Sequence, residues 1–146
     1  MENIKFKKLR PLAQEPKHGS AAAAGYDLYS AVEGLMVINP HQTVKMSTGL
    51  AMELPEGTFG AIFARSGLAT KQGLRPANCV GVIDSDYRGE IIVAVHNDSD
   101  TPQVIEEGDR IAQLVLLPYI PMEFTEVEEL NETDRGEGGF GSTGTN

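Results

Sequence analysis

Short runs of alternating or continuous apolar residues, each bounded by glycine, proline, asparagine or aspartate, recur along most of this chain. Such runs are typical of β-strands, and the residues between them are typical of turns. About ten short strands at near-regular spacing favour an all-β sandwich, jelly roll or barrel. The clearest predicted strands cover residues 4–9, 35–38, 43–46, 50–54, 59–64, 79–83, 91–96 and 111–118.

One segment departs from the strand pattern. Ser66 occupies an N-cap position, helix-forming residues follow it, and Gly73 stands at the far end. Serine caps helix N-termini, and glycine ends helices because it adopts the left-handed conformation without strain. The sequence therefore predicts a single short helix over residues 66–73.

The glycine-rich C-terminus, residues 131–146, cannot build a core, yet it is not plain linker sequence. Glycine keeps a segment mobile and lets backbone amides approach an anion, and the fork of Arg135 suits phosphate oxygens. Phe140 is the only large apolar side chain there. The segment is either a disordered tail or an arm that folds over a ligand with phosphates at one end and a flat ring at the other. We expect one β domain over residues 1–130, followed by this flexible arm.

Composition limits the possible partners. A chain of 146 residues with 40% hydrophobic residues suits one domain with a real core. The net charge of −9 opposes binding to nucleic acid. No apolar run reaches the length of a membrane span, and the N-terminus lacks the apolar block of a signal peptide. Cys79 is the only cysteine, so no intrachain disulfide forms. A cytoplasmic location is expected.

Arg65 and Ser66 stand where the predicted strand 59–64 meets the predicted helix. Unpaired amides and the positive end of the helix dipole favour an anion there, and Arg65 would add a bidentate contact. A surface arginine beside an ordinary capping serine explains the same residues, so this segment alone leaves both interpretations open.

Asp84 and Tyr87 lie in a tight turn between two apolar strands. Asp84 follows a strand that looks buried, where an unpaired carboxylate would be costly. It could act there as a general base on water, or its side chain could bond to its own backbone in an Asx-turn. Tyr87 either forms the wall of a sugar site or covers the sheet.

Two further polar residues stand among apolar neighbours. If the strand over 111–118 is regular, Gln113 shares an apolar face with Ile111 and Val115, so it needs a hydrogen-bond partner, and a neighbouring chain or a ligand could supply it. Asp27 could help to hold a hydrated metal, pair with an arginine, or simply belong to a turn. The three histidines do not cluster, which gives no zinc pattern, and no GxxxxGK[ST] loop is present.

Together these segments resemble the trimeric deoxyuridine triphosphatase family over nearly the whole chain. Five motifs in the family's order and spacing are far more specific than any single one. The family fold is a distorted jelly roll of the β-clip type, which agrees with the expected strands. The motifs are AGYDLYSA (24–31), ARSGLA (64–69), GVIDSDYRGEI (81–91), GDRIAQLV (108–115) and RGEGGFGSTG (135–144).

The resemblance implies Mg²⁺-assisted hydrolysis of dUTP to dUMP and pyrophosphate, which limits uracil incorporation into DNA and supplies dUMP for thymidylate synthesis. It makes Asp84 the residue that activates water for in-line attack on the α-phosphorus. Tyr87 would pack on the deoxyribose where a 2′-hydroxyl would clash. The residues implied to contact the base are Asn78, Gly81, the hairpin backbone near 89–93, and Phe140, which would stack on the uracil.

The resemblance also implies a homotrimer in which each site uses residues from three subunits, with the arm supplied in trans. Asp27 would contact magnesium through ordered water, and the metal would otherwise lie on the substrate phosphates. The residues implied to bind the phosphates are Arg65, Ser66, Gly67, Gln113, Arg135, Ser142 and Thr143.

Two other functions compete with this one. The related dCTP deaminase shares the fold, but the intact motifs at 81–91 and 135–144 argue against it. A nucleotide sensor or scaffold that binds dUTP as a switch is the rival from another class. An insertion or extra domain would favour that role, and the sequence shows neither.

Overall fold

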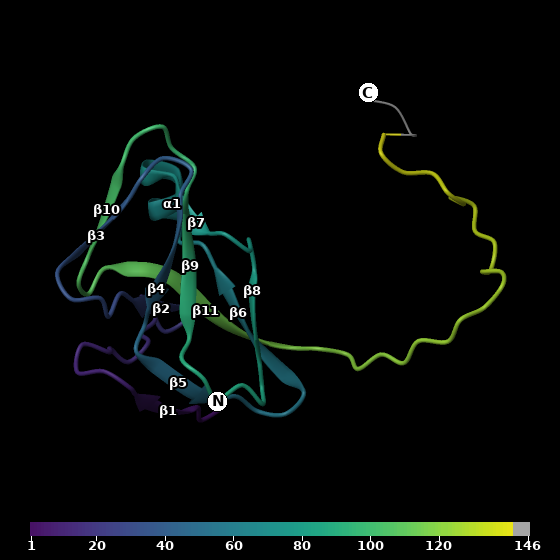
Figure 1. Ribbon diagram of the computed structural model, residues 1–146. Coiled ribbons are helices and arrows are strands. Elements are labelled where there is room, and N and C mark those ends of the chain that lie inside the picture. The colour runs from purple at the N-terminus through teal and green to yellow at the C-terminus, as the bar shows by residue number, and fades with distance from the viewer. Residues whose placement is uncertain (142–146) are drawn as a thin grey trace.

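Eleven short strands and one short helix form the body of the protein within residues 1–141, the part of the chain that the computed structural model describes (Figure 1). The elements in chain order are β1 (Lys5–Lys8), β2 (Tyr26–Tyr29), β3 (Leu35–Ile38), β4 (Thr43–Ser47), β5 (Leu50–Glu53), β6 (Thr58–Phe63), α1 (Ser66–Gln72), β7 (Leu74–Pro76), β8 (Gly81–Asp84), β9 (Ile92–Asn97), β10 (Gln103–Glu106) and β11 (Arg110–Pro118).

The strands pair antiparallel in four small sheets, ordered β2-β11-β6-β8, β4-β9-β7, β1-β5 and β10-β3. The long strand β11 lies between β2 and β6, which come from distant parts of the chain (Figure 1). Such long-range antiparallel pairing, with sheets wrapped around one core, is jelly-roll-like. The predicted all-β fold with one short helix is therefore confirmed.

The core lies between these sheets and follows the two-residue period of the strands. In β9, Val93, Val95 and Asn97 point inward, while the residues between them are more exposed. Fully burying one large apolar side chain contributes about 1.5–3 kcal/mol before the entropy of ordering is counted. The largest buried apolar side chains are Leu28, Ile38, Met46, Leu50, Leu74, Ile91, Val93, Val95, Ile105 and Ile111.

Three strands were not predicted from the sequence, namely β2, β7 and β10. Each is short, and none shows a clear alternation of apolar and polar residues. β2 lies against β11, β7 against β9, and β10 against β3. Pairing with a partner strand therefore decides their conformation, and local propensity does not.

The predicted helix is present, but its N-cap was predicted wrongly. Arg65 is the N-cap, it makes no side-chain capping bond, and Ser66 is already the first helical residue. The C-terminal prediction is confirmed, since Gly73 has a left-handed φ of 67° and its amide donates to the carbonyl of Ala69. None of the helical structure in residues 1–141 has the length and apolar character of a membrane span.

After β11 the chain leaves the body. The last backbone hydrogen bond to the body, among the described residues, runs from the Tyr119 amide to the Gly57 carbonyl at 3.1 Å. Figure 1 shows the following segment running far from the sheets. Residues 120–130 thus extend outward together with the predicted arm. The exposed large apolar side chains of this extension are Ile120, Met122, Phe124, Val127, Leu130 and Phe140.

Candidate active site

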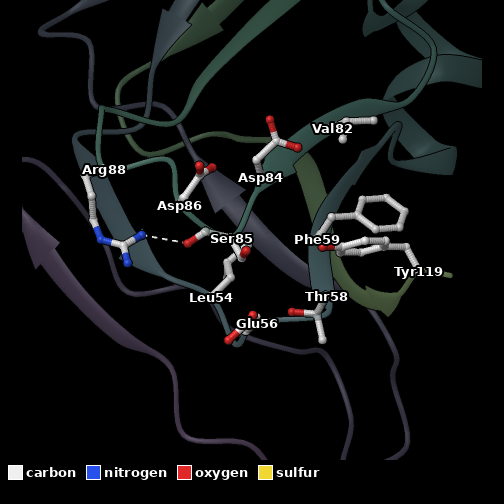
Figure 2. A pocket seen from close by; sticks show the side chains of 10 residues that line it. All are labelled: Leu54, Glu56, Thr58, Phe59, Val82, Asp84, Ser85, Asp86, Arg88 and Tyr119. Atoms are coloured by element: carbon white, nitrogen blue, oxygen red, sulfur yellow. Dashed lines mark hydrogen bonds between the residues drawn. The ribbon is translucent and has the colours of Figure 1, made fainter. Parts of the chain in front are cut away.

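Asp84 ends β8, and the chain turns immediately after it (Figure 2). The turn is closed by backbone groups: the Tyr87 amide donates to the Asp84 carbonyl at 3.1 Å, and Arg88 Nη1 donates to the Ser85 carbonyl at 2.7 Å. Within residues 1–141 the Asp84 carboxylate accepts no hydrogen bond, so the Asx-turn interpretation is wrong. The carboxylate is left available to water or a ligand.

The Asp84 side chain is also more exposed than the sequence suggested. β8 is the edge strand of its sheet, and its alternate residues Val82 and Asp84 face outward. They border a groove of about 930 Å³, in which Phe59 and Tyr119 lie across from Asp86 and Arg88 (Figure 2). The expected desolvation cost is absent because water reaches the carboxylate directly.

Tyr87 and Asp84 share a second, smaller hollow. The Tyr87 hydroxyl donates to the Glu90 carbonyl at 2.8 Å. A Cβ on Gly89 would lie 2.5 Å from that hydroxyl, so only glycine lets the ring lie here. The hollow measures about 170 Å³ and is lined by Val82, Ile83, Asp84, Tyr87, Glu90 and Ile92. A tyrosine ring and a carboxylate therefore face one space.

Asn78 and Gly81 lie at the start of β8, at the other end of this strand from Asp84. Gly81 pairs with Ile62, and a Cβ on Gly81 would lie 2.9 Å from the Ile62 Cβ and 3.3 Å from Asn78 Nδ2. Glycine is thus needed for the close approach of these two strands. Asn78 is exposed and stands beside this entry to the hairpin.

Arg75 holds the connection that carries Asn78. Its Nη1 donates to the Pro76 carbonyl at 3.1 Å, and its Nη2 lies 3.2 Å from Asp98 Oδ1. The hydrogen bond from Arg75 holds the pKa of the Asp98 carboxyl below its ordinary value. The contribution of this pair is therefore present at neutral pH, and it is lost as the pH falls through the lowered pKa of Asp98.

A separate polar cluster forms around Asp27, Arg65 and Gln113. β11 brings it together, because Gln113 pairs with Asp27 on one side and with Phe63 on the other. Arg65 Nε donates to Asp27 Oδ1 at 2.7 Å, and Arg110 Nη1 lies 3.5 Å from Asp27 Oδ2. Of the three roles considered for Asp27, the structure shows the pairing with arginine.

Gln113 has a hydrogen-bond partner in its own chain, a source that the sequence did not suggest. Gln113 Nε2 donates to the Ala64 carbonyl at 2.8 Å, which uses one of the two N–H donors of the amide. The expected regular alternation also fails at the start of β11. A register shift between Arg110 and Ala112 leaves both Ile111 and Ala112 buried.

Gly25 makes room for the Gln113 side chain. A Cβ on Gly25 would lie 2.1 Å from Gln113 Oε1, closer than atoms can approach. We expect Gly25→Ala to displace Gln113 and weaken the bond to Ala64, raising the KM for an anionic substrate several-fold while the fold persists. Gly19→Ala is the matched control, because a Cβ there meets nothing within 4 Å. Steady-state kinetics and thermal unfolding of both variants test this expectation, and an unchanged KM in Gly25→Ala would contradict it.

Ser66 and Gly67 begin α1 beside Arg65. Both are exposed, and a Cβ on Gly67 would meet nothing within 4 Å. The first amides of a helix have no partner within the helix. The junction between β6 and α1 thus presents these amides on an open surface, beside the partly buried Arg65 guanidinium that is paired with Asp27.

Within residues 1–141 of one chain, the hairpin that carries Asp84, the polar cluster around Asp27 and the arm lie apart from one another. Asp84 pairs with Phe59 at one end of β6, and Arg65 follows its other end, about 20 Å away at the strand rise per residue. In the arm, Arg135 Nε donates to the Gly138 carbonyl at 2.8 Å, and Phe140 is fully exposed. Ser142 and Thr143 lie outside the described residues.

The side chains that could hold a metal ion are scattered over the described part of the chain. Across residues 1–141, no three His, Cys, Asp or Glu side chains lie close enough to hold an ion. Both Asp27 oxygens face arginine nitrogens. Magnesium prefers oxygen ligands and keeps several waters. These residues fit an outer, water-mediated contact and do not fit direct coordination by the protein.

Comparison with known proteins gives the family. The profile described as dUTPase matches residues 13–144, which is most of the chain. The chain belongs to the dUTPase family. The deoxyuridine 5′-triphosphate nucleotidohydrolase of Desulfitobacterium hafniense (strain DSM 10664 / DCB-2) is 56% identical over 130 residues, covering 88% of this chain and 86% of the relative.

Solved dUTPase structures share the fold. A mutant dUTPase of Staphylococcus bacteriophage 80alpha with dUpNHpp has a TM-score of 0.89 and 30% identity, covering 99% of this chain and 100% of that one. A mutant dUTPase from phage phi11 of S. aureus, described as revealing the coordination of a structural Mg(II) ion, has a TM-score of 0.77 and 28% identity, covering 88% and 98%.

Several residues around these dUTPase motifs escaped the sequence reasoning. Arg110 faces Asp27, and Tyr119 borders the groove at Asp84. Glu90 extends from the hairpin to the turn between β4 and β5. All three stand within or beside predicted motifs, so proximity was a usable signal. The contacts of Glu90 had no local signal, because the residues that donate hydrogen bonds to its side chain are 43 and 41 residues away in the sequence.

Proposed function

We propose that this chain hydrolyses dUTP to dUMP and pyrophosphate, and so limits uracil incorporation into DNA and supplies dUMP for thymidylate synthesis. One observation carries the proposal. An unpaired carboxylate and a fixed tyrosine ring, Asp84 and Tyr87, face one small hollow in a hairpin of a dUTPase-family chain. A cytoplasmic location, close to the nucleotide pool, goes with this role.

In the proposed reaction, the Asp84 carboxylate accepts a proton from a water molecule. The water oxygen forms a bond to the α-phosphorus, and the bond from that phosphorus to the oxygen bridging the β-phosphate breaks. Pyrophosphate leaves with the electron pair of that bond. Positioned general bases contribute about 10²–10⁴-fold to such steps.

Selection of a uracil deoxynucleotide rests on the hairpin. The Tyr87 ring lies where it would pack on the deoxyribose, so a 2′-hydroxyl would clash with it. Asn78 and Gly81, together with the backbone near 89–93, would contact the base edge. A tight hairpin would leave no room for the methyl group of thymine.

Binding a triphosphate to an acidic protein needs local positive charge. A triphosphate carries about four negative charges near neutral pH, and the protein carries −9. Arg65, the amides of Ser66 and Gly67, and Gln113 would bind phosphate oxygens, together with Arg135, Ser142 and Thr143 of the arm. Asp27 would orient Arg65 and reach Mg²⁺ only through water. Magnesium on the phosphates would supply charge stabilisation for the leaving group.

We propose a homotrimer with sites shared between subunits. The separation of Asp84 from Arg65 by about 20 Å supports this, because a nucleotide cannot span both within one chain. A neighbouring subunit, related by the three-fold rotation of a closed trimer, that places its Arg65 near the hairpin would complete the site. The extended segment 120–141 is long enough to reach another subunit.

Pyrophosphate release from a panel of dUTP, dCTP, dTTP and UTP, with and without Mg²⁺, tests the function. We expect rapid release from dUTP with magnesium and little from the other nucleotides. Deamination of dCTP would favour the deaminase alternative. Binding of dUTP without turnover would favour the sensor, and no reaction with dUTP over hours would overturn the proposal.

The exposed Phe140 gives a prediction that separates catalysis from stability. Phe140 packs on nothing within residues 1–141, so its removal costs the folded body no contact. We expect Phe140→Ala to lower kcat/KM for dUTP by about tenfold through lost stacking on the base, worth roughly 1–3 kcal/mol. The melting temperature should stay the same. Exposed Phe124→Ala, outside the arm motif, is the control. A large fall in melting temperature in Phe140→Ala would contradict this role.

A further inference from the structure

The Glu90 side chain ties the hairpin to the body of the protein. Its Oε1 accepts hydrogen bonds from the Ser47 hydroxyl and, at 2.9 Å, from the Gly49 amide. Arg10 Nε lies 3.6 Å from the same oxygen. The Glu90 side chain is only 17% exposed, which makes these contacts more than surface pairing. One carboxylate therefore joins the hairpin to the turn between β4 and β5.

The backbone of the same residue holds Tyr87. The Glu90 carbonyl accepts the hydrogen bond from the Tyr87 hydroxyl at 2.8 Å. The next residue, Ile91, is locked as well, since its amide donates to the Leu50 carbonyl and its carbonyl accepts from Thr48 Oγ1 at 2.6 Å. Gly89, the residue before Glu90, has no side chain that could fix the turn after β8. Glu90 is thus the first firmly held residue after the turn.

We propose that Glu90 is a positioning residue that fixes the Tyr87 ring and thereby sets the discrimination between deoxyribose and ribose. Without its side-chain bonds, the segment 88–90 can shift, and the tyrosine hydroxyl moves with the carbonyl that holds it. A displacement of about 1 Å is enough to change rates by up to about 10²-fold at an active site. This inference rests on the proposed function.

The chemistry of the contacts separates two substitutions at this position. Glu90→Gln keeps an oxygen that accepts from Ser47 and Gly49, and loses only the charge opposite the half-exposed Arg10. Glu90→Ala loses all three contacts. The charge is therefore predicted to matter little for selectivity, and the acceptor oxygen to matter greatly.

The test measures kcat and KM for both dUTP and UTP. In Glu90→Ala we expect the UTP/dUTP ratio of kcat/KM to rise by about tenfold, with Glu90→Gln near the wild-type ratio. Ser47→Ala is the second variant, which keeps the test possible if Glu90→Ala does not fold. It removes one donor to Glu90 outside the hairpin and should raise the UTP/dUTP ratio by a smaller amount. Glu53→Ala is the matched control, since Glu53 pairs only with the exposed Lys5 at 3.3 Å.

A double-mutant cycle shows whether Glu90 acts through Tyr87. Once Tyr87→Ala has removed the ring, adding Glu90→Ala should leave the UTP/dUTP ratio unchanged. Equal losses on both nucleotides in Glu90→Ala and Ser47→Ala, with no change in ratio, would overturn the inference and leave Glu90 as a merely stabilising residue. If the wild-type protein hydrolysed neither nucleotide, the proposed function itself would fail, which is a different outcome.

Discussion

Asp84→Asn is expected to abolish dUTP hydrolysis while leaving nucleotide binding intact. Asparagine has nearly the same shape, but its amide does not accept a proton from water near neutral pH. The Asp84 carboxylate is exposed and supports no hydrogen bond within the described residues, so the fold loses nothing. A fall in kcat of about 10³-fold, within the range for loss of a general base, should accompany an unchanged Kd for dUpNHpp.

The neighbouring Asp86 provides the control for this prediction. Asp86 is an exposed aspartate in the same turn and borders the larger groove, but it does not line the hollow shared with Tyr87. Asp86→Asn makes the same change in charge and should retain most of the activity. Near-normal turnover in Asp84→Asn would remove Asp84 as the base, and equal losses in both variants would point to net charge as the cause.

Deleting residues 132–146 is expected to leave a folded assembly with little activity. The chain from 120 to 141 makes no backbone hydrogen bond to the sheets, so its removal exposes no core (Figure 1). The proposed site loses Arg135, Phe140, Ser142 and Thr143 together, along with the closure that excludes bulk water. We expect kcat/KM to fall by at least about 10²-fold, with the melting temperature and the number of subunits in the assembly unchanged.

A full-length variant distinguishes the arm's chemistry from its mere presence. In Arg135→Ala combined with Phe140→Ala the arm keeps its length and glycines but loses its guanidinium and its ring. Most of the loss seen on deletion should appear in this variant. Full activity of the truncated protein would show that the arm does not close the site, and dissociation on size-exclusion chromatography would show that it holds the assembly together.

The sequence was a good guide where local chemistry is decisive. Short apolar runs bounded by turn residues predicted strands such as β3 and β9, and Gly73 marked the end of the helix because glycine adopts its φ without strain. Local patterns failed for β2, β7 and β10, since each is stabilised by a partner strand distant in the sequence. The prediction of Ser66 as the N-cap failed for a related reason. Arg65 is the N-cap, its side chain pairs with Asp27 from a distant strand, and no side chain makes a capping bond.

The sequence by itself determined the class of fold, the dUTPase motifs and the types of residue that serve a phosphate and a uracil ring, because these depend on side-chain chemistry and short-range order. Only the tertiary structure decided which groups meet. β11 brings Gln113 between Asp27 and Phe63, the edge position of β8 leaves Asp84 open to water, and Glu90 reaches Gly49 across the fold. Contacts of this kind depend on strand register and sheet edges, which long-range antiparallel pairing sets and no local run of residues records.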